Sequence, residues 1–369
     1  MRRNKIIISC GGTGGHIFPA IEIAKSLKTL NPDIDLLFVG AINKMEMVKV
    51  PKAGFSIIGI WIQGLYRKSI FKNLLFPIKL FISLLHSFLI LLYYRPCAVI
   101  GTGGFATGPI LFAASVMNYK TYIQEQNCFP GLTNKLLGKW AHKIFVAHND
   151  MDMFFPINKI MNFGNPVRKS LKIKNDIKTI NAARSFFGLS YNKFTILVIG
   201  GSLGAEPINK GVHSNLSSLI QNDCQLIWQT GGLEYEYYKN LNSNNCSVQN
   251  FIERMDLAYS AADIVISRAG AIAIAEISLL AKPSILIPSP HVTDDHQNKN
   301  AYYLKKNNAT VLINECDFIN TSLFDIVKDF KDEQYRKQIG DNAWKLFNYN
   351  AADNIANIII NEIKNKHVK

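Results

Sequence analysis

The sequence is poor in acidic residues. Its 369 residues include 27 Asp and Glu against 41 Lys and Arg, which gives a formal net charge of +14. A basic protein of this kind is suited to nucleic acid, to an anionic membrane or to a phosphorylated substrate. A genome-wide bias toward Lys, Asn and Ile would produce the same charge without any functional demand. Charge alone therefore does not decide among these partners.

Cysteine is also scarce, and its six positions form no Cys-x-x-Cys pair. We therefore expect neither a disulfide framework nor a zinc site, and the usage is typical of a reducing compartment. No separate apolar signal region precedes the opening strand, so we expect the protein to stay in the cytoplasm. The cysteines stand at positions 10, 97, 128, 224, 246 and 316.

No apolar run reaches the ~20 residues that cross a bilayer. Residues 80–94 come nearest; they are apolar on nearly every side, but His86 interrupts them. This pattern predicts a helix that is buried over most of its length. The preceding residues 61–79 mix large apolar groups with cations, a mixture that suits an anionic leaflet. We therefore expect attachment to a membrane surface through residues 64–80.

The sequence does contain an apolar opening run, residues 5–10, followed by glycines at 11, 12, 14 and 15. Pro19 is tolerated only in the first turn of a helix, so a helix is predicted to begin near His16. The apolar period of this helix stops at Asn31 and Pro32. A strand, a glycine loop and a helix together form an anion site, most often for phosphate.

Strands and helices alternate through the chain, which predicts an α/β fold with parallel sheets covered on both faces. Asn165 and Pro166 force an extended step and mark a joint between two Rossmann-like halves. We assign residues 1–166 to an N-terminal domain and 167–346 to a C-terminal domain. The last helix, near residues 354–364, fits either half by its pattern, and we assign 347–369 to the first. The later strands are predicted at 34–40, 55–60, 98–101, 120–124, 143–147, 194–199, 225–229, 247–251, 263–267, 284–288 and 310–313.

Further motifs follow the carboxyl ends of predicted strands, where open α/β sheets bind their ligands. Glycine loops occupy residues 101–109 and 200–205, and polar residues 124–127 follow the fifth strand. Residues 268–276 start another helix, with Glu276 in its first two turns. The Glu276 carboxylate either accepts hydrogen bonds from two ribose hydroxyls or only complements the helix dipole.

Metal ligands are not indicated. His291, His296 and the aspartates between them match no compact ligand set, and no cysteine assists them. The Asp-x-Asp triplets at 33–35 and 150–152 are interpreted as structural, the second as a helix cap. No glycine loop has the Gly-x-Gly-x-x-Gly spacing with an acidic residue ~20 positions later, which argues against a nicotinamide dehydrogenase. We expect neither a metal nor a cofactor.

Together these motifs resemble the MurG family of bacterial N-acetylglucosaminyltransferases, which has the GT-B glycosyltransferase fold. Each motif is weak alone, but they occur in the family's order across nearly the whole chain. They comprise residues 11–16, 19–20, 103–105, 108–109, 125–127, 131–135, 164–168, 200–205, 268–276 and 295–301.

The resemblance implies two Rossmann-like domains that face each other across a cleft. It implies transfer of N-acetylglucosamine from UDP-N-acetylglucosamine to the 4-hydroxyl of undecaprenyl-diphosphoryl-N-acetylmuramoyl-pentapeptide (lipid I), with inversion and without a metal. The product is lipid II, a precursor of peptidoglycan. The expected location is peripheral, on the cytoplasmic face of the bacterial cell membrane, and no nucleic acid is expected as a partner.

The resemblance also implies residue roles. His16 is the expected general base, because a sugar hydroxyl is a poor nucleophile; alternatively it holds a phosphate or the loop backbone. Glu125 is the second candidate for the base. Gln124 stands where the family commonly has a histidine, so a proton-transfer role is not expected there. The acceptor diphosphate is expected at Gly103 and Gly104. UDP-N-acetylglucosamine is expected at Thr13, Gly14, Gly15, Asn127, Arg168, Ser202, Ile252, Ala271, Ile272, Ala273, Ile274, Ala275, Glu276 and Gln297.

Two other interpretations fit the same motifs. One keeps the fold and changes the reaction, as in a UDP-N-acetylglucosamine 2-epimerase or another lipid glycosyltransferase. The other is a nucleotide-sugar-binding membrane scaffold without catalysis, against which His16, Glu125 and Glu276 argue. Release of UDP that depends on the acceptor, and turnover by the purified protein, distinguish these alternatives.

Overall fold

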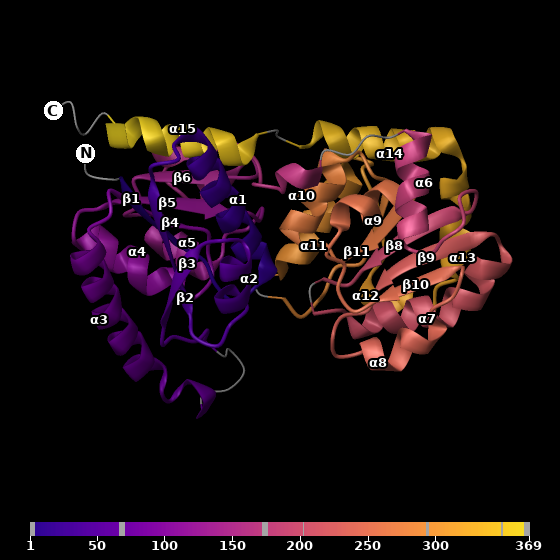
Figure 1. The fold of residues 1–369 in the computed structure, drawn as a ribbon, viewed down its shortest axis with the longest axis horizontal. Coiled ribbons are helices and arrows are strands. Elements are labelled where there is room, and N and C mark those ends of the chain that lie inside the picture. Colours follow the sequence, from indigo (N-terminus) through magenta and orange to yellow (C-terminus); the bar gives the residue numbers. More distant parts are fainter. Residues whose placement is uncertain are drawn as a thin grey trace. The chain divides into compact units, whose positions relative to one another are not determined.

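The computed structural model describes residues 4–65, 71–171, 176–201, 203–292, 295–347 and 350–364. The chain divides into two compact units, each a sheet covered by helices (Figure 1). Unit 1 comprises residues 1–167 and 348–369, and unit 2 comprises residues 168–347. The division falls between Val167 and Arg168, beside the joint predicted at residue 166.

Unit 1 is built on a parallel sheet with the strand order β3-β2-β1-β4-β5-β6-β7. The central strand β1 pairs with both β2 and β4, so that Ile8 lies between Phe38 and Ile100. The strands are β1 (Lys5–Ser9), β2 (Asp35–Ala41), β3 (Ser56–Ile60), β4 (Ala98–Gly101), β5 (Lys120–Glu125), β6 (Lys143–Val146) and β7 (Ile160–Asn162). The helices are α1 (Gly14–Leu30), α2 (Glu46–Lys52), α3 (Phe76–Tyr94), α4 (Thr107–Val116), α5 (Leu132–Leu137) and α15 (Ala351–Lys364), with short 3-10 turns η1 (Phe71–Asn73), η2 (Met151–Met153) and η3 (Ile157–Lys159).

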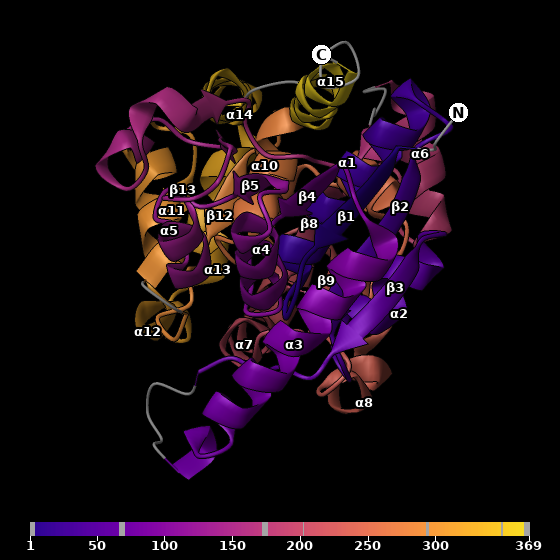
Figure 2. The same cartoon turned by 90° about the vertical axis from the view of Figure 1, so that its left-hand side faces the viewer.

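Helices cover both faces of this sheet, which explains why β1 is a continuous apolar run. Ile6 and Ile8 pack on one face against α1, α2 and α15. Ile7 packs on the other face against α3, α4 and α5. Figure 2 shows α3, α4 and α5 side by side on that face.

The last helix, α15, belongs to unit 1. Its apolar stripe, which includes Ile355 and Ile359, is buried with side chains of α1 in the core of this unit. Glu362 adds a polar anchor, because its carboxylate accepts a hydrogen bond from the Tyr122 hydroxyl at 2.6 Å and lies 2.9 Å from His142 Nε2. The chain therefore returns to unit 1 after unit 2 is complete.

The prediction that residues 80–94 form a buried helix is wrong. They are helical, within α3, but the buried residues of α3 are limited to Ser83, Ser87, Ile90 and Leu91. The apolar composition does not reveal that α4 and the sheet cover one side of the helix. α3 is also the one helix of the described residues that is long and apolar enough to cross a membrane, which is weak evidence of a span. Its exposed apolar residues are Ile78, Phe81, Ile82, Leu85, Leu89, Leu92 and Tyr93.

Unit 2 repeats the plan of unit 1 with the strand order β10-β9-β8-β11-β12-β13, again all parallel. The strands are β8 (Phe194–Ile199), β9 (Cys224–Gln229), β10 (Cys246–Gln249), β11 (Ile264–Ser267), β12 (Ser284–Leu286) and β13 (Val311–Leu312). The helices are α6 (Ile177–Phe186), α7 (Glu206–Gln221), α8 (Tyr235–Tyr238), α9 (Met255–Ala261), α10 (Ala271–Leu279), α11 (His296–Lys306), α12 (Glu315–Phe318), α13 (Leu323–Val327) and α14 (Glu333–Lys345), with 3-10 turns η4 (Lys169–Leu171), η5 (Lys239–Leu241) and η7 (Lys328–Lys331).

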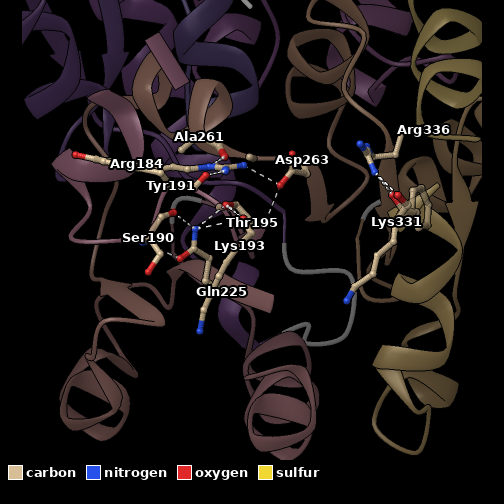
Figure 3. A network of polar contacts seen from close by, with 12 residues as sticks. Arg184, Ser190, Tyr191, Lys193, Thr195, Gln225, Ala261, Asp263, Lys331 and Arg336 are labelled. Atoms are coloured by element: carbon tan, nitrogen blue, oxygen red, sulfur yellow. Dashed lines mark hydrogen bonds and ion pairs between the residues drawn. The ribbon is translucent and has the colours of Figure 1, made fainter. Parts of the chain in front are cut away.

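A polar network at the amino ends of β8, β9 and β11 ties α6 to the sheet of unit 2 (Figure 3). Arg184 of α6 donates to Asp263 at 2.9 Å, and the same carboxylate oxygen accepts the Thr195 N–H at 2.7 Å. The Gln225 side chain accepts the Ser190 N–H at 2.9 Å. This edge is opposite to the one that carries the glycine loop, so the network supports the fold and not the site.

Every strand predicted from the sequence is present, and the ends differ by at most two residues. Strand β7 is not predicted from the sequence; it has three residues and lies at the edge of its sheet. So short an edge strand carries almost no periodic signal. The predicted α/β class with two parallel sheets is confirmed.

Candidate functional site

The candidate site residues lie at the carboxyl edges of the two sheets. The strand order reverses between β1 and β4 in unit 1 and between β8 and β11 in unit 2. Ligands of open α/β sheets bind at such switch points. The loops that follow these four strands are residues 10–13, 102–106, 200–205 and 268–270, which include the glycine motifs of the sequence.

The first loop leads directly into the N-terminus of α1. Thr13 occupies the N-cap position, but its side chain makes no capping hydrogen bond. The first N–H groups of α1, at Gly14 and Gly15, can therefore meet an anion. Gly12 has φ +86°, a left-handed backbone that costs other residues about 1–2 kcal/mol. The loop is thus shaped for close approach of a ligand to its backbone.

His16 is held by its own loop. Its Nδ1 lies 3.1 Å from the Gly11 carbonyl oxygen and 3.2 Å from the Thr13 hydroxyl. A carbonyl oxygen can only accept, so the contact with Gly11 requires a proton on Nδ1. In the neutral ring Nε2 then carries the lone pair, which is the state that a general base needs.

The second glycine loop closes directly over the first. Gly103 and Gly104 both have positive φ, at 99° and 86°. A Cβ atom at Gly103 would lie 2.8 Å from His16 Cδ2, and one at Gly104 would lie 2.2 Å from the Gly11 carbonyl oxygen. Both positions therefore require glycine. The structure brings the predicted base and the predicted acceptor-diphosphate loop into contact.

Glu125, the second candidate for the base, is completely engaged. One carboxylate oxygen accepts the N–H and the side-chain amide of Asn127, at 3.0 and 3.1 Å. The other accepts the Gly131 N–H at 3.2 Å and the Asn134 amide at 2.9 Å. Burial raises the pKa of the Glu125 carboxyl, while these hydrogen bonds act to lower it. A carboxylate offers about four lone-pair sites, and all four are used. This geometry orders residues 127–134 and favours His16 as the base.

Gln124 takes part in a buried amide network. Its side chain donates to Asn165 at 3.2 Å, and Asn165 donates to the Gln126 carbonyl at 3.0 Å. Gln126 in turn donates to the Thr102 carbonyl at 2.7 Å, in the loop after β4. Since all of these groups are neutral amides or carbonyls, the network positions the loops and supplies no proton.

The glycine loop of unit 2 is held by Gln229, the last residue of β9. The Gln229 amide donates to the Gly201 carbonyl at 2.8 Å, and its oxygen accepts the Ile252 N–H at 2.8 Å. One side chain thus joins the glycine loop to the predicted uracil neighbour, Ile252. Gly204 has φ +85° and approaches the backbone after β9 closely. The predicted donor contact Ser202 lies outside the described residues.

Glu276 and Arg168 form an ion pair within unit 2. Arg168 Nε donates to one carboxylate oxygen of Glu276 at 2.9 Å, and the Tyr259 hydroxyl donates to the other at 3.2 Å. Glu276 is 3% exposed. Burial and the charge of Glu276 raise the pKa of Tyr259, so the phenol stays protonated and can donate. Two predicted donor contacts, 108 residues apart in sequence, are therefore adjacent.

The helix that carries Glu276 has an open N-terminus. Gly270 is the N-cap residue of α10 and offers no capping side chain, and the first turn holds no acidic residue. The first N–H groups of α10 can therefore bind an anion. Apolar side chains fix the helix in the core, including Ile274 and Ile277. The predicted contacts of this helix are Ala271, Ile272, Ala273, Ile274 and Ala275.

Gln297 lies at the start of α11, beyond β12. Its side-chain oxygen accepts the Ser289 N–H at 2.9 Å, so it fixes the loop that follows β12. Asn300, one turn later, donates to the Ala269 carbonyl at 3.4 Å. Among the described residues, no group of three or more His, Cys, Asp and Glu side chains could hold a metal ion.

Three residues of the site were missed in the sequence. Glu46 is fully buried beneath the first glycine loop, where it accepts the Gly12 N–H. Gln229 and Tyr259 hold the loops and the carboxylate of unit 2. Gln229 carried a usable signal, because it is a polar residue that ends a buried strand. Glu46 and Tyr259 carried none, since each meets its partner through the fold.

Comparison with known proteins finds matches to one glycosyltransferase family in both units. Residues 6–146 match the model of the glycosyltransferase family 28 N-terminal domain, and residues 195–355 match that of its C-terminal domain. A curated relative from Flavobacterium psychrophilum is 45% identical over 99% of this chain and 100% of its own length. One from Parabacteroides distasonis is 43% identical over 99% and 100%. Both are named UDP-N-acetylglucosamine–N-acetylmuramyl-(pentapeptide) pyrophosphoryl-undecaprenol N-acetylglucosamine transferase.

Solved structures agree with this match. MurG from Acinetobacter baumannii is 25% identical to this chain, with a TM-score of 0.74 over 97% of this chain and 99% of that one. A UDP-N-acetylglucosamine 2-epimerase has a TM-score of 0.61 over 97% and 95% at 12% identity, which shows a shared fold alone.

Proposed function

Because this chain belongs to glycosyltransferase family 28, we propose that it transfers N-acetylglucosamine from UDP-N-acetylglucosamine to undecaprenyl-diphosphoryl-N-acetylmuramoyl-pentapeptide. The product of this step is the lipid-linked disaccharide precursor of peptidoglycan. The observation that carries the proposal is the 45% identity to a transferase of that name over 99% of this chain. The contact between His16 and the two glycine loops of unit 1 supports it.

His16 is the proposed base. As the 4-hydroxyl oxygen of the acceptor attacks C1 of the donor sugar, its proton passes to Nε2 of His16. The new O–C1 bond forms on the face opposite to the C1–O bond that breaks, and UDP leaves with that bonding pair. The configuration at C1 is therefore inverted. The Nδ1 contact with Gly11 O supports this role, because it keeps the lone pair on Nε2.

The charge that develops on departing UDP is met by backbone N–H groups. The open N-terminus of α10 and the loop before α7, whose N-cap Ala205 also lacks a capping side chain, supply these donors. Oriented N–H groups stabilise an oxyanion without reorganising during the reaction. We therefore propose that the leaving group needs no metal ion.

The donor is assigned to unit 2. Ile252 is proposed beside uracil, and Glu276 on the ribose hydroxyls. Arg168 and Tyr259 each donate to one oxygen of Glu276 and so fix the orientation of its carboxylate, which supports that role. Gln297 and Asn127 are proposed on the sugar, and Ser202 on the diphosphate.

The membrane-bound acceptor is assigned to unit 1. The outward faces of α3, α4 and α5 carry exposed apolar side chains, among them Phe81, Leu85 and Leu136. Lys79 lies beside them, 5.3 Å from the Trp61 ring. Apolar groups with neighbouring cations suit the interface of an anionic leaflet. We propose peripheral attachment through this face on the cytoplasmic side, which keeps the enzyme near its lipid substrate.

Release of UDP by the purified protein, with and without the lipid-linked acceptor, tests the proposal. We expect UDP release to require the acceptor and to be accompanied by label in the lipid fraction when the donor sugar is radioactive. Equal release without the acceptor, or conversion of the donor to its C2 epimer, would instead favour an epimerase. Donor binding with no turnover under either condition would favour a scaffold.

A further inference from the structure

Glu46 is a buried carboxylate without a role in the steps above. It is the first residue of α2 and is 0% exposed. Its Oε2 accepts the Gly12 N–H at 3.1 Å, and its Oε1 accepts the Ala41 N–H at 3.0 Å. Burying a carboxylate costs desolvation free energy unless hydrogen bonds compensate for it. A carboxylate in this position therefore calls for a structural or functional explanation.

The two ends of one peptide group connect Glu46 to His16. The N–H of Gly12 belongs to the same peptide unit as the carbonyl of Gly11. That N–H donates to Glu46 at 3.1 Å, and that carbonyl lies 3.1 Å from His16 Nδ1. Hydrogen bonds in a chain polarise one another, so a negative charge on the N–H side makes the carbonyl oxygen a better acceptor.

We propose that Glu46 is a positioning residue for His16, acting through the Gly11–Gly12 peptide group to hold the imidazole with its proton on Nδ1 and its lone pair on Nε2. In a catalytic triad, a carboxylate accepts a hydrogen bond directly from Nδ1 of the histidine and so orients the ring. Here we infer the same orienting role for Glu46, but a peptide group lies between the carboxylate and the imidazole. The expected effect on turnover rests on the proposed function. The expected effect on the tautomer and titration of His16 does not depend on a substrate.

The surrounding packing keeps this relay in place, where the relay is the chain of contacts from Glu46 through the Gly11–Gly12 peptide group to His16. A Cβ atom at Gly40 would lie 2.5 Å from Glu46 Cγ, and one at Gly11 would lie 3.0 Å from Glu46 Oε1. Gly104 contacts the Gly11 carbonyl from the other side. Glu46 and Gly104 therefore both pack closely against the Gly11–Gly12 peptide group, which restricts its rotation.

Two ionisable groups lie beside the relay in the described contacts. Burial, followed by the charge of Glu46, raises the pKa of the Cys10 thiol on β1, so Cys10 stays protonated. Glu125 on β5 holds Asn134, whose amide nitrogen is 3.3 Å from the Cβ position of Gly103. Neither group takes the place of Glu46 on the Gly12 N–H.

The test compares Glu46→Gln with Glu22→Gln in the full chain. Glu22 is a matched control, because it is also buried in unit 1 but pairs with Lys25 along α1. Histidines are labelled with 15N, and the His16 signals are assigned from their loss in His16→Gln. Titration without substrate reads the midpoint and tautomer of His16 directly. The pH dependence of turnover is measured in parallel.

In the unmodified protein we expect neutral His16 to carry its proton on Nδ1. Loss of the negative charge in Glu46→Gln should lower the His16 midpoint by about 0.5–1 unit, because a nearby anion favours the charged imidazolium. We expect kcat to fall about tenfold, with the KM for UDP-N-acetylglucosamine changed less than about twofold. Glu22→Gln should change none of these quantities.

An unchanged His16 midpoint in folded Glu46→Gln would overturn the proposal, as would an Nε2-protonated tautomer in the unmodified protein. If Glu46→Gln does not fold, the tautomer of His16 in the unmodified protein is the deciding measurement. Failure of the proposed function is distinguishable, because the protein would then lack acceptor-dependent UDP release while the His16 titration still responded to residue 46.

Discussion

One glycine loop in each unit follows the equivalent strand, β1 in unit 1 and β8 in unit 2, but the two loops rest on different groups. In unit 1 the loop after β1 rests on a carboxylate, Glu46, which accepts the Gly12 N–H. In unit 2 the loop after β8 rests on a neutral amide, Gln229, which donates to the Gly201 carbonyl. Both supports are buried side chains reached from a neighbouring strand or the helix after it. The two units therefore share a fold but differ in the charge of the side chain that supports the glycine loop.

The difference separates proton chemistry from anion binding. A carboxylate beneath the loop of unit 1 raises the proton affinity of a histidine base in that loop. A neutral amide leaves the N–H dipoles of the unit 2 loop at full strength for a diphosphate. We therefore expect changes near the loop of unit 1 to act mainly on kcat, and changes near the loop of unit 2 to act mainly on donor affinity.

The largest effect is expected for His16→Ala. Loss of a general base lowers turnover by about 10²–10⁴-fold, whereas donor affinity should change little. Steady-state kinetics with the lipid-linked acceptor, together with calorimetric binding of the donor, separates the two quantities. An equal loss of turnover and donor affinity would show that His16 merely binds.

Gly104→Ala should come next, because it disturbs the contact between the two loops of unit 1. The new Cβ atom would meet the Gly11 carbonyl at 2.2 Å in a left-handed backbone. We expect a stability loss of about 3 kcal/mol, from backbone strain and overpacking together, and a large fall in kcat. Urea unfolding measures the stability.

Gly188→Ala is the control for backbone strain. It also has a positive φ, +70°, but a Cβ atom there meets nothing within 4 Å. Its cost should be about 1 kcal/mol, with kcat unchanged. Equal destabilisation by the two substitutions would show that the contact with Gly11 is unimportant.

Gln229→Leu should have a moderate effect with the opposite kinetic pattern. It leaves the Gly201 carbonyl and the Ile252 N–H without their partner, at a cost of about 1–3 kcal/mol. We expect the KM for UDP-N-acetylglucosamine to rise about tenfold and kcat to fall less. A loss confined to kcat would remove the distinction between the two loops.

Lys79→Glu should have the smallest effect and no effect on chemistry. One cation near an anionic leaflet contributes about 1 kcal/mol, so sedimentation with anionic vesicles should weaken severalfold. Lys306→Glu, on α11 of unit 2, serves as the control and should leave vesicle binding unchanged. Equal vesicle binding by all three proteins would refute attachment through the face of α3.

Periodicity and glycine placement were sufficient to predict the strands, the α/β class and the loops that carry His16, Gly103 and Glu276. They could not show which faces other elements cover. For that reason the sequence pattern predicts that α3 is buried, and it fits α15 to either half, whereas Ile355 and Ile359 pack with α1 in unit 1. Pairs such as Arg168 with Glu276 and Gly12 with Glu46 arise only when distant segments meet in the fold.

The most direct measurement is transfer of radioactive N-acetylglucosamine to the lipid-linked acceptor in the presence of EDTA. The proposed chemistry, with a histidine base and a leaving group stabilised by N–H dipoles, predicts full incorporation of label into the lipid fraction. Absence of label, or activity that EDTA abolishes and added magnesium restores, would contradict it.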